Sequence, residues 1–156
     1  YPNLLIVNAF TKFYAMAGLR LGYLMTGDLS LLHAVAQQLP EWNVSSIAQR
    51  AGISALQDTE YEKRTRQLIE KERRYLIQEF LKMGCTVFPS EADYITFRLP
   101  QEKTGFLLKE RLLEGKILIR SCANYRSMPP DCYRIAVKQH ADNEELVRQV
   151  WRILIQ

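Results

Sequence analysis

The chain has 156 residues, of which 47% are hydrophobic and 24% are charged, the proportions of an ordinary globular domain or slightly more. Its net charge of +4 comes from 21 basic and 17 acidic residues that are interleaved, which argues against a nucleic-acid-binding stripe, and no run approaches the ~20 apolar residues of a membrane-spanning helix. The three cysteines lack metal-ligand spacing, so we expect no metal site and a reducing, cytoplasmic compartment.

The first part of the chain alternates short apolar runs with helical patterns. Continuous apolar runs at Leu4–Val7 and Leu21–Met25 predict strands that are covered on both faces, as in a parallel sheet. Helices are expected over Leu29–Leu39, which stops at a proline, and from Val44 to Leu56, where apolar residues recur with a period of 3.6.

The rest of the chain reads as strands alternating with helices, which predicts an α/β architecture. A long helix begins at Thr59, where Thr59 and Glu62 have the spacing of a capping box, and ends at Gly84. Asp142 and Glu145 repeat that spacing at the last helix. The further expected elements are strands at Cys85–Phe88, Tyr94–Leu99, Ile117–Ile119 and Tyr133–Val137, and helices at Gly105–Leu113 and Asp142–Leu154.

Lys12 lies just beyond the first predicted strand, the position at which α/β folds bind ligands. An amine there can form a Schiff base with an aldehyde cofactor if its proton affinity is lowered, and a nearby cation such as Arg20 would lower it. Arg20 can also bind a phosphate through two hydrogen bonds, and Thr11 can add a hydroxyl to the same anion. Gly18 and Gly22 would let the backbone come close. From spacing alone, the more ordinary interpretation is a surface lysine beside a structural arginine.

The stretch from Thr11 to Tyr23 resembles the signature of the fold-type I pyridoxal-phosphate enzymes of the aminotransferase class I/II family: Ser/Thr-Lys, small residues, then Gly-Leu-Arg-x-Gly-Tyr. The resemblance implies that Lys12 is covalently linked to pyridoxal 5′-phosphate, while Thr11 and Arg20 hold the cofactor phosphate. Ala9 departs from the pattern, because the family commonly has Ser or Thr there. One phosphate-binding hydroxyl is therefore expected to be missing.

The resemblance also implies a domain organisation. Residues 1–57 would be a remnant of the large cofactor-binding domain with the start of the interdomain helix, and residues 58–156 the complete small α/β domain. Family members carry an aspartate for the pyridine nitrogen and further phosphate ligands upstream of the lysine, and a chain that begins so close to Lys12 has no place for them. We therefore expect a C-terminal portion, inactive alone, of a homodimeric enzyme.

The segment "KILIRSCANYRSMPPDCYRIAVK" supplies two further candidates, Arg120 and Arg134, on neighbouring predicted strands. In the family, the arginine of the Tyr-Arg-Ile/Val-Ala-Val pattern, here Arg134, binds the substrate carboxylate or another acidic group. Arg120 is the second candidate for substrate binding. The alternative for each is a structural arginine at a sheet edge, and the sequence does not assign phosphate and carboxylate between them.

Two subfamilies are compatible with these motifs. Histidinol-phosphate aminotransferases share the signatures of Lys12 and Arg134. Threonine-phosphate decarboxylases of cobalamin biosynthesis resemble the chain more closely, through Phe10–Ala15, Ala55–Asp58 and above all Ile117–Tyr125. The resemblance thus implies decarboxylation of the small phosphorylated amino acid L-threonine O-3-phosphate to aminopropanol phosphate. An aminotransferase is the alternative, and a non-catalytic association fragment is the alternative from another class.

Overall fold

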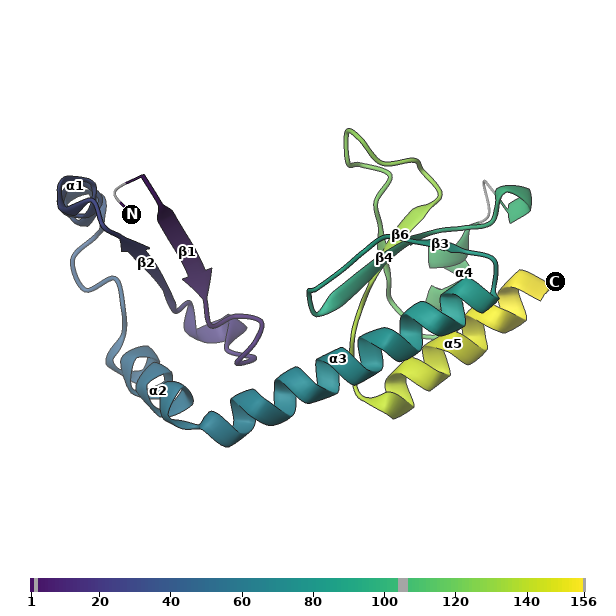
Figure 1. Cartoon of the computed structure of the whole chain (residues 1–156), viewed down its shortest axis with the longest axis horizontal. Helices are drawn as coiled ribbons and strands as arrows, with labels where there is room; N and C mark the ends of the chain where they lie inside the picture. Colours follow the sequence, from purple (N-terminus) through teal and green to yellow (C-terminus); the bar gives the residue numbers. More distant parts are fainter. Residues whose placement is uncertain (2, 104–106, 156) are drawn as a thin grey trace. The chain divides into compact units, whose positions relative to one another are not determined.

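The computed structural model describes residues 1, 3–103 and 107–155, and it contains two compact units, Tyr1–Thr65 and Arg66–Gln156. Figure 1 shows both units as a ribbon. The boundary lies inside one continuous helix, α3 (Thr59–Lys82), whereas the sequence suggested a division after residue 57. The assignment of these parts to a large and a small domain stays a prediction. None of the helices in the described ranges is long and apolar enough to cross a membrane.

Unit 1 contains a two-stranded antiparallel sheet of β1 (Leu5–Ala9) and β2 (Gly22–Thr26). Both strands were expected, but the expectation of a parallel sheet is wrong for this pair, because the two strands run antiparallel. Every residue of β1 is exposed, and the Val7 side chain is 73% exposed. A continuous apolar run does not encode strand direction. The chain returns at the same end of the sheet, where Ala9 pairs with Gly22, so the two strands run antiparallel.

Two helices complete unit 1 and begin at side-chain caps. In α1 (Leu29–Gln38), Asp28 Oδ1 accepts hydrogen bonds from the backbone amides of residues 30 and 31, at 2.9 and 3.0 Å. In α2 (Ser46–Gln57), Ser45 Oγ accepts from the amide of Ala48 at 3.1 Å. Capping of these orphan amides explains why both helices begin where they do, and their extents agree with the predicted ones.

The start of α3 differs from the predicted capping box. The cap is Asp58, whose Oδ1 accepts a hydrogen bond from the backbone amide of Tyr61 over 2.8 Å, and Thr59 is already the first helical residue. A carboxylate is also favoured at this position by the positive end of the helix dipole. The predicted helix is therefore confirmed, and the predicted cap is wrong by one residue.

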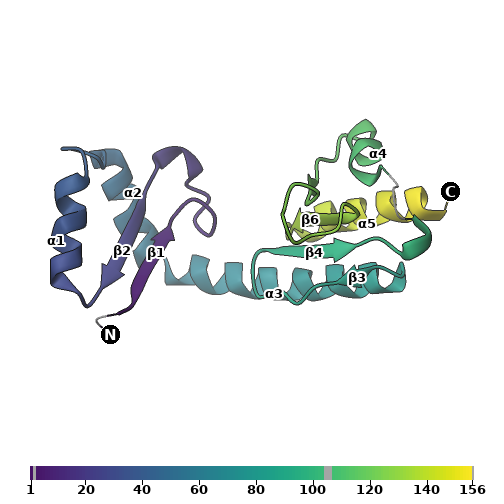
Figure 2. The same ribbon diagram turned by 90° about the horizontal axis from the view of Figure 1, so that it is seen from above.

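Unit 2 is a four-stranded antiparallel sheet with strand order β3-β4-β6-β5 and helices against it. Its strands are β3 (Thr86–Val87), β4 (Tyr94–Arg98), β5 (Arg120–Ser121) and β6 (Cys132–Ala136), and its other elements are α4 (Leu108–Glu114), α5 (His140–Ile155) and a short 3₁₀ turn (Gln101–Lys103). The α3 and α5 helices run side by side along the sheet (Figures 1 and 2).

One hydrophobic core holds unit 2 together. The expected alternation in β4 is confirmed, because Ile95 and Phe97 are fully buried while Tyr94 and Arg98 are exposed. The core also contains residues from the three helices and from β6: Leu76, Phe80, Leu108, Leu112, Ile135, Val147 and Val150. The helices therefore cover one face of the sheet, and the opposite face presents the alternate residues of each strand.

Gly84 ends α3 as the sequence indicated. Its φ is +78°, its amide donates to the carbonyl of Leu81 at 3.0 Å, and the amide of Cys85 donates to the carbonyl of Phe80 at 3.1 Å. These two bonds form a Schellman motif, which satisfies the last free carbonyls of the helix and requires a left-handed residue at this position.

Three other boundaries differ from the expectations. No strand forms at Ile117–Ile119, and the strand falls at β5 instead. The helix expected at Gly105–Leu113 is α4, and residues 104–106 lie outside the described residues. Asp142 does not cap the last helix, because the amide of Asn143 already donates to the carbonyl of Gln139 at 3.1 Å, so the helix begins earlier.

Candidate functional site

Thr11, Lys12 and Arg20 all lie in the segment that connects β1 to β2. Figure 1 shows the course of this segment. The two ends of this connection are adjacent, since Ala9 and Gly22 are register partners and the amide of Phe10 donates to the carbonyl of Leu21 over 3.0 Å. The connection therefore holds its three candidate residues at one end of the two-stranded sheet.

The segment around Lys12 is a closed loop with its own hydrogen bonds. The amide of Ala15 donates to the carbonyl of Lys12 at 2.9 Å, and the amide of Met16 donates to the carbonyl of Phe10 at 3.2 Å. Ala15 has a left-handed φ of 53°, a strained conformation for a residue with a Cβ. We call residues 10–16 the lysine loop.

Arg20 follows a short 3₁₀ turn and also has a left-handed backbone, with φ 52°. Its guanidinium donates through Nη1 to the carbonyl of Ala17 over 3.1 Å, which leaves its other N–H groups available. Lys12 and Arg20 are both exposed, and in the part of the chain that the structure describes neither forms an ion pair with a carboxylate. Two cations and the Thr11 hydroxyl on one short connection form a donor set that suits an anion such as a phosphate.

Of the two glycines in the signature, Gly22 is required by close packing. A Cβ added to Gly22 would lie 2.8 Å from the carbonyl oxygen of Asn8 in the neighbouring strand. A Cβ added to Gly18 would meet nothing within 4 Å in the described structure. Gly22 therefore lets β1 and β2 pack closely, and approach of the backbone to an anion at either glycine stays a prediction.

The base of the lysine loop packs against α2. Phe10 is only 5% exposed, and a Cβ added to Gly52 of α2 would lie 2.5 Å from Cδ2 of Leu21 and 3.9 Å from a ring carbon of Phe10. Gly52 thus permits the helix to approach both ends of the connection. In the sequence, this contact is indicated only by a glycine on the apolar face of the predicted helix, a pattern that does not by itself point to a site.

Arg120 and Arg134 are brought together by sheet register in unit 2. They are direct partners across β5 and β6, and Thr96 is the partner of Arg134 on the other side. Register partners lie on the same face of a sheet, so the two guanidinium groups share one face, and like charges placed directly opposite are destabilising. Within the described residues, neither arginine forms an ion pair, so no carboxylate there offsets the repulsion.

Polar and aromatic side chains support these two arginines instead. Cζ of Arg134 lies 4.7 Å from the centre of the Tyr94 ring, and Cζ of Arg120 lies 5.9 Å from the centre of the Tyr125 ring. Arg120 also donates through Nη2 to Oδ1 of Asn124 at 3.3 Å. Sequence analysis did not identify these supporting residues, although Tyr94 lies on the polar face of the alternating β4 pattern, which was the available signal.

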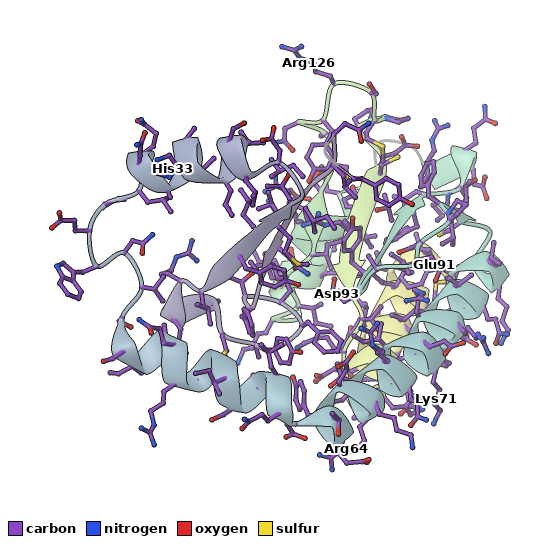
Figure 3. All side chains as sticks on the ribbon, turned by 60° about the vertical axis from the view of Figure 1, so that its left-hand side comes forward. His33, Arg64, Lys71, Glu91, Asp93 and Arg126 are labelled. Carbon is purple, nitrogen blue, oxygen red and sulfur yellow. The ribbon has the colours of Figure 1, made fainter. Side chains whose placement is uncertain are left out.

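A third arginine on this sheet is already neutralised. Arg98 donates through Nε to Oδ2 of the buried Asp131 at 2.8 Å, and this hydrogen bond and the Asp131 charge raise the pKa of Arg98. Burial raises the pKa of both neighbouring thiols, Cys122 and Cys132, so these cysteines are poor nucleophiles. Arg120 and Arg134 are therefore the candidate anion-binding groups of this face, whose outer loop carries the exposed Arg126 (Figure 3).

Comparison with known proteins assigns the chain to a family. The profile of the family "Aminotransferase class I and II" matches residues 1–150. The chain belongs to the aminotransferase class I and II family. The threonine-phosphate decarboxylase of Salmonella typhimurium is 36% identical over 154 residues, which are 98% of this chain and 42% of that protein. The family expectation from the Lys12 signature is thereby confirmed.

Solved structures in this family have the same fold. The histidinol-phosphate aminotransferase of Clostridium acetobutylicum matches with a TM-score of 0.92 at 32% identity, covering 99% of this chain and 47% of that one. The histidinol-phosphate aminotransferase of Sinorhizobium meliloti, a structure in complex with pyridoxal-5′-phosphate, matches with a TM-score of 0.85 at 23% identity, covering 99% and 42%. The α/β transferase fold is confirmed, and the chain spans less than half the length of these relatives.

Proposed function

We propose that this chain is part of a pyridoxal-phosphate-dependent enzyme that decarboxylates L-threonine O-3-phosphate to aminopropanol phosphate. The family membership and the similarity to a threonine-phosphate decarboxylase support this proposal. The direct pairing of Arg120 with Arg134 on one sheet face supports a substrate with two anionic groups, and the similarity to the threonine-phosphate decarboxylase carries the choice of reaction. Two guanidinium groups that form no ion pair among the described residues suit such a substrate, and threonine phosphate carries a phosphate and a carboxylate.

The lysine loop and Arg20 carry the groups that binding of pyridoxal phosphate requires. Lys12 offers a primary amine that is exposed and forms no ion pair among the described residues, as covalent attachment to an aldehyde requires. Arg20 has N–H groups available for a phosphate, and Thr11 adds a hydroxyl. When bound, the cofactor supplies an electron-withdrawing ring that makes loss of a carboxyl group or a proton from the substrate possible.

The chain's own residues would then select the reaction. Arg120 and Arg134 would bind the two anionic groups of the substrate and so fix which bond of its amine-bearing carbon is oriented for cleavage. Tyr94 and Tyr125 would keep the guanidinium planes in place through their ring contacts. The amine of Lys12, once released from the cofactor, would accept or return a proton.

A product assay on the complete enzyme tests the proposal. The enzyme is supplied with O-phosphothreonine alone, and in parallel with histidinol phosphate plus 2-oxoglutarate. Release of carbon dioxide without amino-group transfer supports the decarboxylase. Formation of glutamate with no carbon dioxide would overturn it in favour of the aminotransferase.

The aminotransferase is retained as the second candidate because the Clostridium acetobutylicum enzyme is nearly as similar to this chain. Glutamate, the usual amino donor of aminotransferases, also carries two anionic groups, so paired arginines alone do not separate the two activities. The homodimer implied by the sequence resemblance and the cytoplasmic location inferred from the cysteine content stay predictions.

A further inference from the structure

The backbone carbonyl that follows Lys12 is bonded by a side chain from a distant part of the sequence. Tyr61 Oη, in the first turn of α3, donates a hydrogen bond to the carbonyl of Phe13 over 2.9 Å, across 48 positions of sequence. The bond is partly buried. It lies within unit 1 and joins the lysine loop to α3.

The loop's internal hydrogen bonds are accepted by the carbonyls of Phe10 and Lys12. The loop also holds Ala15 in a left-handed conformation, which persists only where the surroundings fix it. The Tyr61 hydroxyl adds a hydrogen bond from outside the loop, at the carbonyl two residues before Ala15.

The ring of Tyr61 adds packing to the hydrogen bond. It stacks on Tyr14 with ring centres 6.0 Å apart and an interplanar angle of 20°, and it meets Phe13 edge-on at 6.3 Å. Tyr14 in turn stacks on Phe10 at 5.0 Å. The three aromatic side chains of the lysine loop are thus held by ring contacts, while Lys12 itself stays exposed.

Tyr61 is itself held in place. Its backbone amide is the one capped by Oδ1 of Asp58 at 2.8 Å, so the helix cap fixes the turn from which the tyrosine reaches the loop. The chain of contacts runs from Asp58 to Tyr61, then to the Phe13 carbonyl beside Lys12.

We propose that Tyr61 is a positioning residue for Lys12: its hydroxyl holds the lysine loop in the conformation that presents the amine for covalent chemistry. The proposal rests on the proposed role of Lys12 as the cofactor attachment point. Tyr61 does not touch the reacting atoms. Its removal should loosen the loop and slow the steps that need Lys12, while substrate binding by Arg120 and Arg134 stays nearly unchanged.

The test compares Tyr61→Phe with Tyr23→Phe in the complete enzyme. Both variants remove one hydroxyl from the same aromatic cluster, because Tyr23 contacts Phe10 with ring centres 6.1 Å apart. The Tyr23 hydroxyl, however, meets the Asn8 side-chain amide at 3.1 Å and not the lysine loop backbone. Tyr23→Phe is therefore the matched control.

The first readout is amide hydrogen exchange of Ala15 and Met16 in the cofactor-free enzyme. Tyr61→Phe should speed exchange by about twofold to tenfold, which corresponds to losing one ordinary hydrogen bond. Tyr23→Phe should leave both rates unchanged. Equal rates in wild type and Tyr61→Phe would overturn the proposal.

The second readout is steady-state kinetics with cofactor bound. Tyr61→Phe should lower kcat, expressed per cofactor-loaded site, severalfold with little change in KM. Counting the loaded sites by absorbance removes the effect of any unfolded fraction. A change in KM alone would contradict a role through Lys12. If Tyr61→Phe does not fold, two variants of Asp58 test the same chain of contacts. Asp58→Ala removes the helix cap and should speed amide exchange of Ala15 and Met16. Asp58→Asn keeps the cap and should leave this exchange unchanged.

A separate experiment distinguishes failure of the proposed role of Lys12 from failure of the positioning role of Tyr61. Reduction of the wild-type enzyme with borohydride, followed by peptide mapping, reports whether the cofactor is attached at Lys12. Attachment elsewhere refutes the role of Lys12, whereas attachment at Lys12 with an unaffected Tyr61→Phe variant refutes the positioning role alone.

Discussion

The side-chain amide of Asn143 donates a hydrogen bond to the buried carboxylate of Glu72 over 3.0 Å and so joins α5 to α3 inside unit 2. Glu72 is 1% exposed, and Nδ1 of His140 lies 3.0 Å from the same oxygen, Oε2. Asn143 also bonds both backbone polar groups of Lys138, through Oδ1 at 3.1 Å and Nδ2 at 2.8 Å. One buried network therefore fixes the start of α5 against the middle of α3.

Glu72→Ala should lower the free energy of unfolding by about 1–3 kcal/mol, because it leaves buried donors without their acceptor. Glu70→Ala is the control, since Glu70 pairs with Arg74 on the exposed side of the same helix and should cost less than about 1 kcal/mol. Urea denaturation followed by circular dichroism measures both. An equal loss of unfolding free energy in the two variants would show that the buried network stabilises the fold no more than an exposed ion pair does.

The same carboxylate predicts a pH dependence of stability. Burial alone would raise the pKa of Glu72, but hydrogen bonds from Asn143 and His140, with the charges of His140 and Lys71, outweigh burial and hold this pKa below its ordinary value of 4.5. A carboxyl whose pKa is lowered on folding stabilises the fold above its unfolded-state pKa, and this contribution is lost as the pH falls through the folded-state value. Glu72→Gln should therefore lose less stability than wild type between neutral pH and about pH 3.

Gly22→Ala should destabilise unit 1, while Gly18→Ala should not. The new methyl group at residue 22 would lie 2.8 Å from the Asn8 carbonyl and force β1 and β2 apart, at a cost of about 1–3 kcal/mol. A methyl group added at residue 18 would enter open space, so Gly18→Ala should change the free energy of unfolding by less than about 0.5 kcal/mol. Amide exchange of β2 measures the difference. A tolerated Gly22→Ala would mean that the strands separate without cost.

Lys12→Ala should abolish covalent cofactor attachment and turnover together in the complete enzyme, because no other group on the lysine loop is a primary amine. Visible absorbance of the purified enzyme and mass analysis after reduction measure attachment. Lys71→Ala, at an exposed position on α3 (Figure 3), is the matched control and should leave both unchanged. Retained colour in Lys12→Ala would identify another lysine as the anchor.

Arg134→Ala should weaken substrate binding far more than cofactor binding. Loss of a charge-assisted, two-point contact costs about 1.5–3 kcal/mol, which is roughly a tenfold to hundredfold rise in KM. Arg126→Ala, at an exposed loop position, is the control and should change neither substrate binding nor cofactor binding. Titration of the cofactor and kinetics with O-phosphothreonine separate the effects, and a parallel loss of cofactor affinity would remove Arg134 from the substrate-binding role.

Much of the local structure could be predicted because its determinants are close in sequence. The alternation of Ile95 and Phe97 with polar residues identified β4, and Gly84 marked the end of α3 because only a left-handed residue suits that position. Lys12 and Arg20 could be singled out because their motif is compact. In each case the residues that decide the structure lie within a few positions of one another.

Only the tertiary structure decided the contacts between residues far apart in sequence. The sequence placed Arg120 and Arg134 on neighbouring strands, but their direct pairing depends on sheet register, which a shift of one residue would abolish. The burial of Glu72 and the bond from Tyr61 to Phe13 likewise depend on packing across 71 and 48 positions. The sequence by itself determined the family and the helices, and it singled out Lys12 as the predicted site of cofactor attachment. The strand direction, the arginine pair and the support of the lysine loop follow from long-range hydrogen bonding and packing, which no local pattern encodes.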